Sequence, residues 1–120
     1  MRRRAAVWYN AKTSPPTETM RLASIEVPID RIATFCRKWG IAELSVFGSV
    51  LRDDFGPDSD IDVLVSFTPG SRMTFEGYLD MRDELSSIFG RQIDLVEKRL
   101  ITNPFRRHEI LTTKRVLYAA

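Results

Sequence analysis

The sequence predicts a single α/β domain, in which a small mixed β-sheet is flanked by helices. Segments with a helical spacing of apolar residues alternate with short β-branched runs, a pattern typical of helices packed on a sheet. The chain has 120 residues, of which 43% are hydrophobic, and this is enough for one core. Cys36 is the single cysteine, so neither an internal disulfide nor a cysteine-based zinc cluster can stabilise the chain instead.

Residues 1–19 are expected to form a flexible leader before a domain that spans residues 20–120. The leader is rich in arginine and contains a Ser-Pro-Pro-Thr stretch without periodic pattern. No segment has the length of a membrane span, and no sustained apolar stretch follows the N-terminal arginines as a secretory signal would require. We therefore expect a cytoplasmic location and no membrane contact.

Residues 28–39 are predicted to form the first helix, and Gly40 can end it. Its apolar residues recur at helical spacing, which places the only cysteine on the buried face: Ile29, Ile32, Cys36 and Trp39. Residues 44–47 then read as an apolar strand.

The turn after this strand has the composition of a phosphate-binding site. Gly48 lets the backbone approach a ligand closely, and the Ser49 hydroxyl with nearby N–H groups of a helix start can hold a phosphate. Arg52, one turn further on, can reach the same phosphates as a forked donor. A Gly- and Pro-containing loop follows, at whose end Ser59 can hydrogen-bond the local backbone.

Two aspartates stand at the start of the next predicted strand, residues 61–67. Asp60 and Asp62 are two positions apart, so both carboxylates project to one face of a strand. Aligned carboxylates repel each other unless a cation lies between them, and hard oxygen ligands suit Mg²⁺. The pair therefore indicates Mg²⁺ and, with it, a nucleotide.

The remaining segments continue the alternation of helix and strand. The sequence predicts a helix over residues 75–89 capped by Thr74, a strand over 92–96 with Asp94 in its middle, a short helix from Asn103-Pro104 to about 111, and an extended segment over 115–118.

These residues resemble the signature of a known superfamily. Gly48-Ser49, Arg52 and Ser59-Asp60-x-Asp62, between two apolar strands, resemble the nucleotidyltransferase superfamily typified by DNA polymerase beta. Over roughly residues 28–119 the chain looks like the minimal nucleotidyltransferases, small prokaryotic proteins often paired with a helical partner of the HEPN class. The superfamily places a third carboxylate on a neighbouring strand, and Asp94 meets that requirement.

The resemblance implies a polymerase-beta-like fold and specific roles for these residues. Asp60, Asp62 and Asp94 would be catalytic and hold two Mg²⁺ ions, with Asp94 as ligand or base. The nucleotide would be bound by a second group: Gly48, Ser49, Arg52 and Ser59.

The activity implied is transfer of a nucleoside monophosphate, AMP from ATP, to a tyrosine hydroxyl of a HEPN-type toxin, so that the protein acts as an antitoxin. A binding-only antitoxin and a small-molecule transferase of the aminoglycoside type remain alternatives. The formal charge of +2 does not indicate a nucleic-acid partner, and none is expected. Six of the eighteen basic residues do lie between Lys98 and Arg115, which we interpret as a solvated face.

Overall fold

The computed structural model describes residues 19–22, 25–52 and 54–120, so the expected leader lies outside the described residues apart from Thr19. In chain order the elements are β2 (Thr19–Leu22), β3 (Ile25–Pro28), α1 (Ile29–Trp39), β4 (Ile41–Phe47), the 3₁₀ turn η1 (Gly48–Leu51), β5 (Ile61–Phe67), α2 (Phe75–Phe89), β6 (Ile93–Glu97), the 3₁₀ turn η2 (Lys98–Leu100), α3 (Pro104–Thr113) and β7 (Arg115–Ala119).

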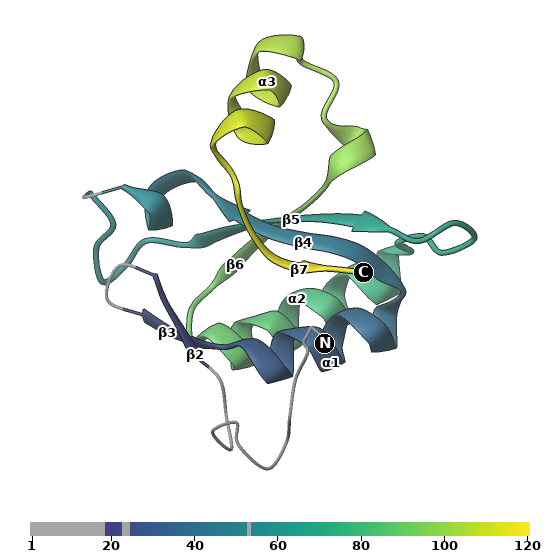
Figure 1. The fold of residues 1–120 in the computed structure, drawn as a ribbon, viewed down its shortest axis with the longest axis horizontal. Helices are drawn as coiled ribbons and strands as arrows, with labels where there is room; N and C mark the ends of the chain where they lie inside the picture. Colours follow the sequence, from purple (N-terminus) through teal and green to yellow (C-terminus); the bar gives the residue numbers. More distant parts are fainter. Residues whose placement is uncertain (1–18, 23–24, 53) are drawn as a thin grey trace.

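The main sheet has four strands in the order β6-β5-β4-β7 and is mixed, as predicted. Strand β4 runs antiparallel to both of its neighbours, whereas β5 and β6 are parallel. Helices α1 and α2 lie together on one face, and α3 stands on the opposite face (Figure 1). Strands β2 and β3 form a separate antiparallel hairpin.

The main core fills the space between the sheet and helices α1 and α2. Alternate residues of β5 point into it, as the period of a strand requires: Ile61, Val63 and Val65. Cys36 of α1 is fully buried there, as predicted, and burial raises the pKa of its thiol to about 12. This cysteine is therefore a packing residue.

A smaller core lies on the other face of the sheet, beneath α3. Phe47 and Leu64 of the sheet contact Ile101 and Ile110 of the C-terminal segment. This cluster fixes α3 over the same face to which the even-numbered residues of β5 project. Helix α3 thus stands beside the start of β5, where the predicted aspartates lie.

Several elements differ from the sequence prediction. Strand β4 begins at Ile41, three residues earlier than expected, because it pairs with β5 along its whole length. The helix start expected after Ser49 is only the short 3₁₀ turn η1. The β2–β3 hairpin was not predicted, since its strands are four residues each and depend on packing Leu22 and Val27 into the main core.

No helix in the described ranges is long and apolar enough to cross a membrane.

The cap of α3 gives a direct test of how this helix is held. The Asn103 side chain accepts hydrogen bonds from the backbone N–H groups of Phe105, at 3.0 Å, and of Arg106, at 3.2 Å. Replacing such a cap with alanine costs about 0.5–2 kcal/mol. We expect Asn103→Ala to lower the free energy of unfolding in urea by that amount, whereas Thr102→Ala, a change at the exposed preceding residue, should leave it nearly unchanged. Equal losses in both variants would contradict a specific capping role.

Candidate active site

The site is built around two aspartates on adjacent parallel strands. The β5–β6 register pairs Asp62 directly with Asp94. Their sequence neighbours, Ile61 and Ile93, point into the main core, so both carboxylates project to the opposite face of the sheet. The two side chains are within hydrogen-bonding range of each other. The structure therefore brings together two of the three predicted carboxylates.

The charged form of Asp62 is disfavoured in this arrangement. Burial first, and then the charge and hydrogen bond of Asp94 and the charge of Asp60, raise the pKa of Asp62 to about 6, against an ordinary value of 3.8. An aspartate of this kind binds a proton more readily than usual, and it is stabilised in its ionised form by a cation. A perturbed carboxylate beside a second carboxylate is a frequent feature of functional sites.

Gly48 lies directly against Asp62. Strand β4 ends at Phe47, which pairs with Asp62 in the β4–β5 register, so the first residue of η1 turns over the carboxylate. Gly48 has φ +76°, in the left-handed region, and a Cβ at this position would overlap Asp62 Oδ2 and lie 3.2 Å from its Cγ. The structure thus explains the predicted glycine in two ways, by its backbone conformation and by the space left for the carboxylate.

The other predicted nucleotide-binding residues are placed less directly. Ser49 is partly buried in η1, and its carbonyl accepts a hydrogen bond from the backbone N–H of Arg52 at 2.9 Å. The Arg52 side chain is exposed and donates to Asp54 Oδ1 at 3.2 Å. Ser59 Oγ accepts from the backbone N–H of Gly56 at 3.0 Å, the local contact that the sequence predicted. The contact that each would make with a nucleotide stays a prediction.

Asp60 is exposed and stands just before β5. Its charge reaches Asp62, but in the part of the chain that the structure describes no three acidic, histidine or cysteine side chains are gathered closely enough to form a ready metal-binding group. The predicted role of Asp60, Asp62 and Asp94 as metal ligands therefore stays a prediction. The carboxylate chemistry fits Mg²⁺, since Asp62 and Asp94 place hard oxygen donors side by side on adjacent strands.

Two arginines near the site were not singled out by the sequence. Arg106, in the first turn of α3, is close enough for its charge to lower the pKa of Asp62, opposing the other effects. Arg91 donates from Nη1 to the carbonyls of Gly56, at 3.1 Å, and Ser59, at 2.7 Å, and so fixes the loop that leads into β5. Neither arginine belongs to the sequence motif. Their proximity to the site becomes visible only in the three-dimensional structure, where α3 carries Arg106 to the sheet and Arg91 follows the end of α2.

Comparison with known proteins shows which family this chain belongs to. The nucleotidyltransferase domain family matches residues 29–117. A protein of Methanocaldococcus jannaschii, provisionally named a protein adenylyltransferase, is 33% identical over 73 residues, which are 61% of this chain and 73% of the relative. A solved structure provisionally described as a minimal nucleotidyltransferase is 29% identical, has a TM-score of 0.60, and covers 72% of this chain and 86% of its own.

A third similarity concerns the fold alone. The structure of a tri-AMPylated Shewanella oneidensis HEPN toxin in complex with its MNT antitoxin contains a chain that is 19% identical, with a TM-score of 0.55, covering 77% of this chain and 70% of that one. The polymerase-beta-like fold and the resemblance to minimal nucleotidyltransferases, both expected from the sequence, are confirmed. This chain belongs to the nucleotidyltransferase domain family.

Proposed function

We propose that this protein is a Mg²⁺-dependent protein adenylyltransferase that moves AMP from ATP to a tyrosine hydroxyl of a HEPN-type toxin and so acts as its antitoxin. Family membership supports the transfer chemistry. The AMPylated HEPN toxin bound to an MNT antitoxin supports both the transferred group and the class of partner. We place the reaction in the cytoplasm, where ATP is available.

One observation carries the proposal: Asp62 and Asp94 are paired across β5 and β6, with Gly48 against the Asp62 carboxylate. Two carboxylates held together in this way destabilise a fold that does not use them. A phosphate-binding turn directly above the pair would bring the phosphates of a nucleotide to the same place. The pairing favours an enzyme over a protein that neutralises its partner by contact alone.

The proposed reaction is an in-line displacement at the α-phosphorus of ATP. The acceptor oxygen forms a bond to that phosphorus, the bond to the bridging oxygen of pyrophosphate breaks, and Asp94 takes up the proton of the acceptor hydroxyl. Gly48 and Ser49 hold the phosphates in position, which provides a large part of the rate enhancement in such reactions. Asp60, Asp62 and Asp94 would hold two Mg²⁺ ions, and bound Mg²⁺ supplies charge stabilisation for the phosphate oxygens.

The test is the intact mass of the cognate HEPN-type partner after incubation with this protein, Mg²⁺ and ATP. We expect nucleotide-sized mass increments with the unchanged protein, mapped by peptide sequencing to a tyrosine, and none with the double variant Asp60→Ala/Asp62→Ala. Omitting Mg²⁺ should give the same negative result. As a matched control, Asp58→Ala/Asp80→Ala removes two exposed carboxylates that lie outside the proposed site and should retain the transfer.

Two outcomes would redirect the assignment. If no nucleoside triphosphate produces an increment while the double variant still binds and neutralises the partner, the protein is a binding-only antitoxin. If the partner is unmodified but an aminoglycoside accepts the nucleotide, the protein is a small-molecule transferase.

A further inference from the structure

Asp60 differs from the other two predicted metal ligands in how its position is fixed. Asp62 and Asp94 lie within strands β5 and β6, whereas Asp60 stands just before β5 and is exposed. Its charge reaches Asp62. Within the described ranges, however, no side chain forms a hydrogen bond or an ion pair with the Asp60 carboxylate. The position of this carboxylate is therefore set by the backbone on either side of it.

That backbone is tied on both sides to the two residues that lead into β6, the strand that carries the third predicted carboxylate. On the N-terminal side, the carbonyl of Ser59 accepts a hydrogen bond from Arg91 Nη1 at 2.7 Å. On the C-terminal side, the backbone N–H of Ile61 donates to the carbonyl of Gln92 at 2.9 Å. Because residues 91 and 92 continue directly into β6, both hydrogen bonds hold this backbone at a fixed place relative to that strand.

The Arg91 side chain is itself held in place. Its Nη1 donates a second hydrogen bond, at 3.1 Å, to the carbonyl of Gly56, which also accepts from the backbone N–H of Ser59 at 3.1 Å. Its guanidinium carbon lies 4.5 Å from the centre of the Phe55 ring, a favourable arrangement of a cation and an aromatic face. Arg91 is therefore a fixed link between the loop before β5 and the segment before β6, and this link closes directly beside Asp60.

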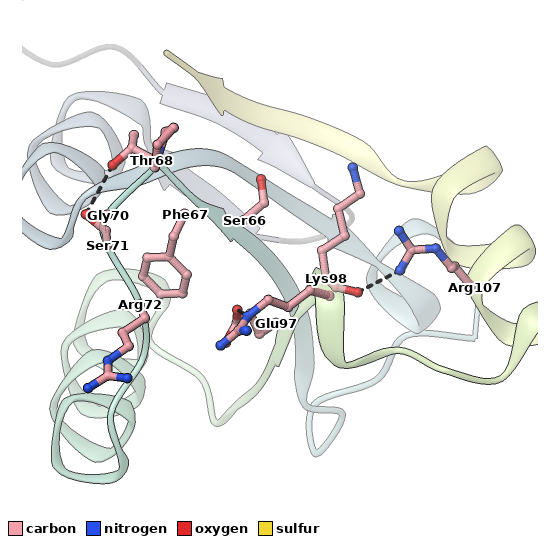
Figure 2. Close-up of a pocket in the computed structure, with 11 residues that line it drawn as sticks. Ser66, Phe67, Thr68, Gly70, Ser71, Arg72, Glu97, Lys98 and Arg107 are labelled. Atoms are coloured by element: carbon pink, nitrogen blue, oxygen red, sulfur yellow. Dashed lines mark hydrogen bonds and ion pairs between the residues drawn. The ribbon is translucent and has the colours of Figure 1, made fainter.

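Arg107 shows what the same kind of contact does away from the aspartates. It donates from Nη1 to the carbonyls of Lys98, at 2.8 Å, and Ile101, at 3.4 Å, and so holds the turn η2 (Figure 2). Four positions along the chain separate Lys98 from Asp94, roughly 13 Å in a strand. Each arginine clamps two backbone carbonyls, but only the turn that Arg91 holds ends at a predicted site residue. Arg107 is thus a control for the purely structural effect of such a clamp.

We propose that Arg91 is a positioning residue for the transfer reaction, which fixes Asp60 beside β6 and so sets its carboxylate in place before Mg²⁺ binds. This role rests on the proposed function, since it requires Asp60 to be a metal ligand. Residues that orient metal ligands without touching the metal typically change metal affinity by ~10–100-fold when they are replaced. Without Arg91 the loop before β5 must become ordered when the cation binds, and this ordering lowers the affinity.

The first measurement is amide hydrogen exchange in the full chain without metal, which reports on the loop directly. In Arg91→Ala the amide protons of Ser59 and Ile61 should exchange at least about tenfold faster, because the loop loses hydrogen bonds from a charged donor. In Arg107→Ala those two amide protons should be unaffected, while the amide proton of Ile101, in the turn that Arg107 holds, should exchange faster.

The second measurement is the Mg²⁺ concentration that half-saturates each variant in the presence of a non-hydrolysable ATP analogue, followed by the amide chemical shifts of Asp62 and Asp94. Arg91→Ala should raise this concentration about 10- to 100-fold, whereas Arg107→Ala should leave it unchanged. Arg91→Lys should restore part of the affinity, because its ammonium keeps a charged donor for a carbonyl of the loop. Unfolding in urea completes the comparison, since both alanine variants lose one clamp and should lose similar stability.

These readouts separate the positioning role from the proposed function. Neither depends on transfer to the partner, so failure of the adenylyltransferase assignment is recognised by an unchanged mass of the partner, whatever Arg91 does. The positioning role stands if Arg91→Ala accelerates exchange beside Asp60 and weakens Mg²⁺ binding while Arg107→Ala does neither. Equal exchange at Ser59 and Ile61 in the two alanine variants, or an unchanged half-saturating Mg²⁺ concentration in Arg91→Ala, would overturn the proposal.

Discussion

Gly48→Ala is expected to reduce nucleotidyl transfer at least about 100-fold, because misplacing a catalytic group by about 1 Å can cost that much. The added Cβ would overlap Asp62 Oδ2 and lie 3.2 Å from Cγ, so the carboxylate must leave its place beside Asp94. Residue 48 also has a left-handed backbone at φ +76°, and this conformation lowers the stability of the alanine variant by about 1–2 kcal/mol. The measurement is the rate of AMP transfer to the partner, with unfolding in urea as a parallel readout.

Gly90→Ala is the matched control for this prediction. Gly90 has nearly the same backbone conformation, φ +69°, but a Cβ there would have no heavy atom within 4 Å. Both variants should therefore lose a similar amount of stability, while only Gly48→Ala loses transfer. If the two variants transferred AMP at the same rate, the close contact between residue 48 and Asp62 would have no catalytic meaning.

The sequence predicted those parts of the site that depend on local pattern. The apolar runs around Asp62 and Asp94 are unambiguous strands, and the turn at the end of β4 follows from the conformational freedom of Gly48. It could not predict the register. A shift of one residue would have turned Asp94 into the core, and only the parallel pairing with β5 places it opposite Asp62.

The residues that the sequence missed depend on tertiary packing. Arg106 reaches the site because Ile110 and the residues around it pack on Phe47 and Leu64, and nothing in the local sequence of α3 indicates that contact. For Arg52 the sequence suggested a contact that the structure does not by itself display. Its spacing from Gly48 indicated a phosphate contact, whereas the structure shows an ion pair with the nearby Asp54. Proximity in sequence suggests possible partners, but the fold selects among them.

Asp62→Asn is expected to abolish most of the activity and at the same time to stabilise the fold. The unfolded chain has an ordinary Asp62 pKa, whereas in the folded chain burial, Asp94 and Asp60 raise it to about 6, with Arg106 of α3 opposing the increase. Between about pH 4 and pH 6 the folded state therefore binds more protons than the unfolded state, so stability falls as the pH rises through this window. Above pH 6 the whole cost of ionising Asp62 is present.

Asparagine removes that cost, so at pH 7 the variant should be more stable by about 1–2 kcal/mol, a value reduced from the full shift because the side chain is only partly buried. The midpoint temperature of thermal unfolding should rise by about 4 °C or more. The loss of stability between pH 4 and pH 6 should become smaller than in the unchanged protein. The control Asp58→Asn makes the same chemical change on the exposed loop and should alter neither quantity. Transfer of AMP should fall at least about 100-fold in Asp62→Asn alone.

Mg²⁺ with ATP provides the decisive comparison for this residue. If Asp62 destabilises the fold because its charge is not neutralised by a bound cation, Mg²⁺ and ATP together should raise the unfolding temperature of the unchanged protein well above that of the apo form. They should raise that of Asp62→Asn much less, because the variant has lost one of the carboxylates that would hold the metal. A variant that gains stability, loses transfer and no longer responds to Mg²⁺ would show that this carboxylate is kept for catalysis at the expense of the fold. Equal stabilisation of both proteins by Mg²⁺ and ATP would instead place the metal elsewhere.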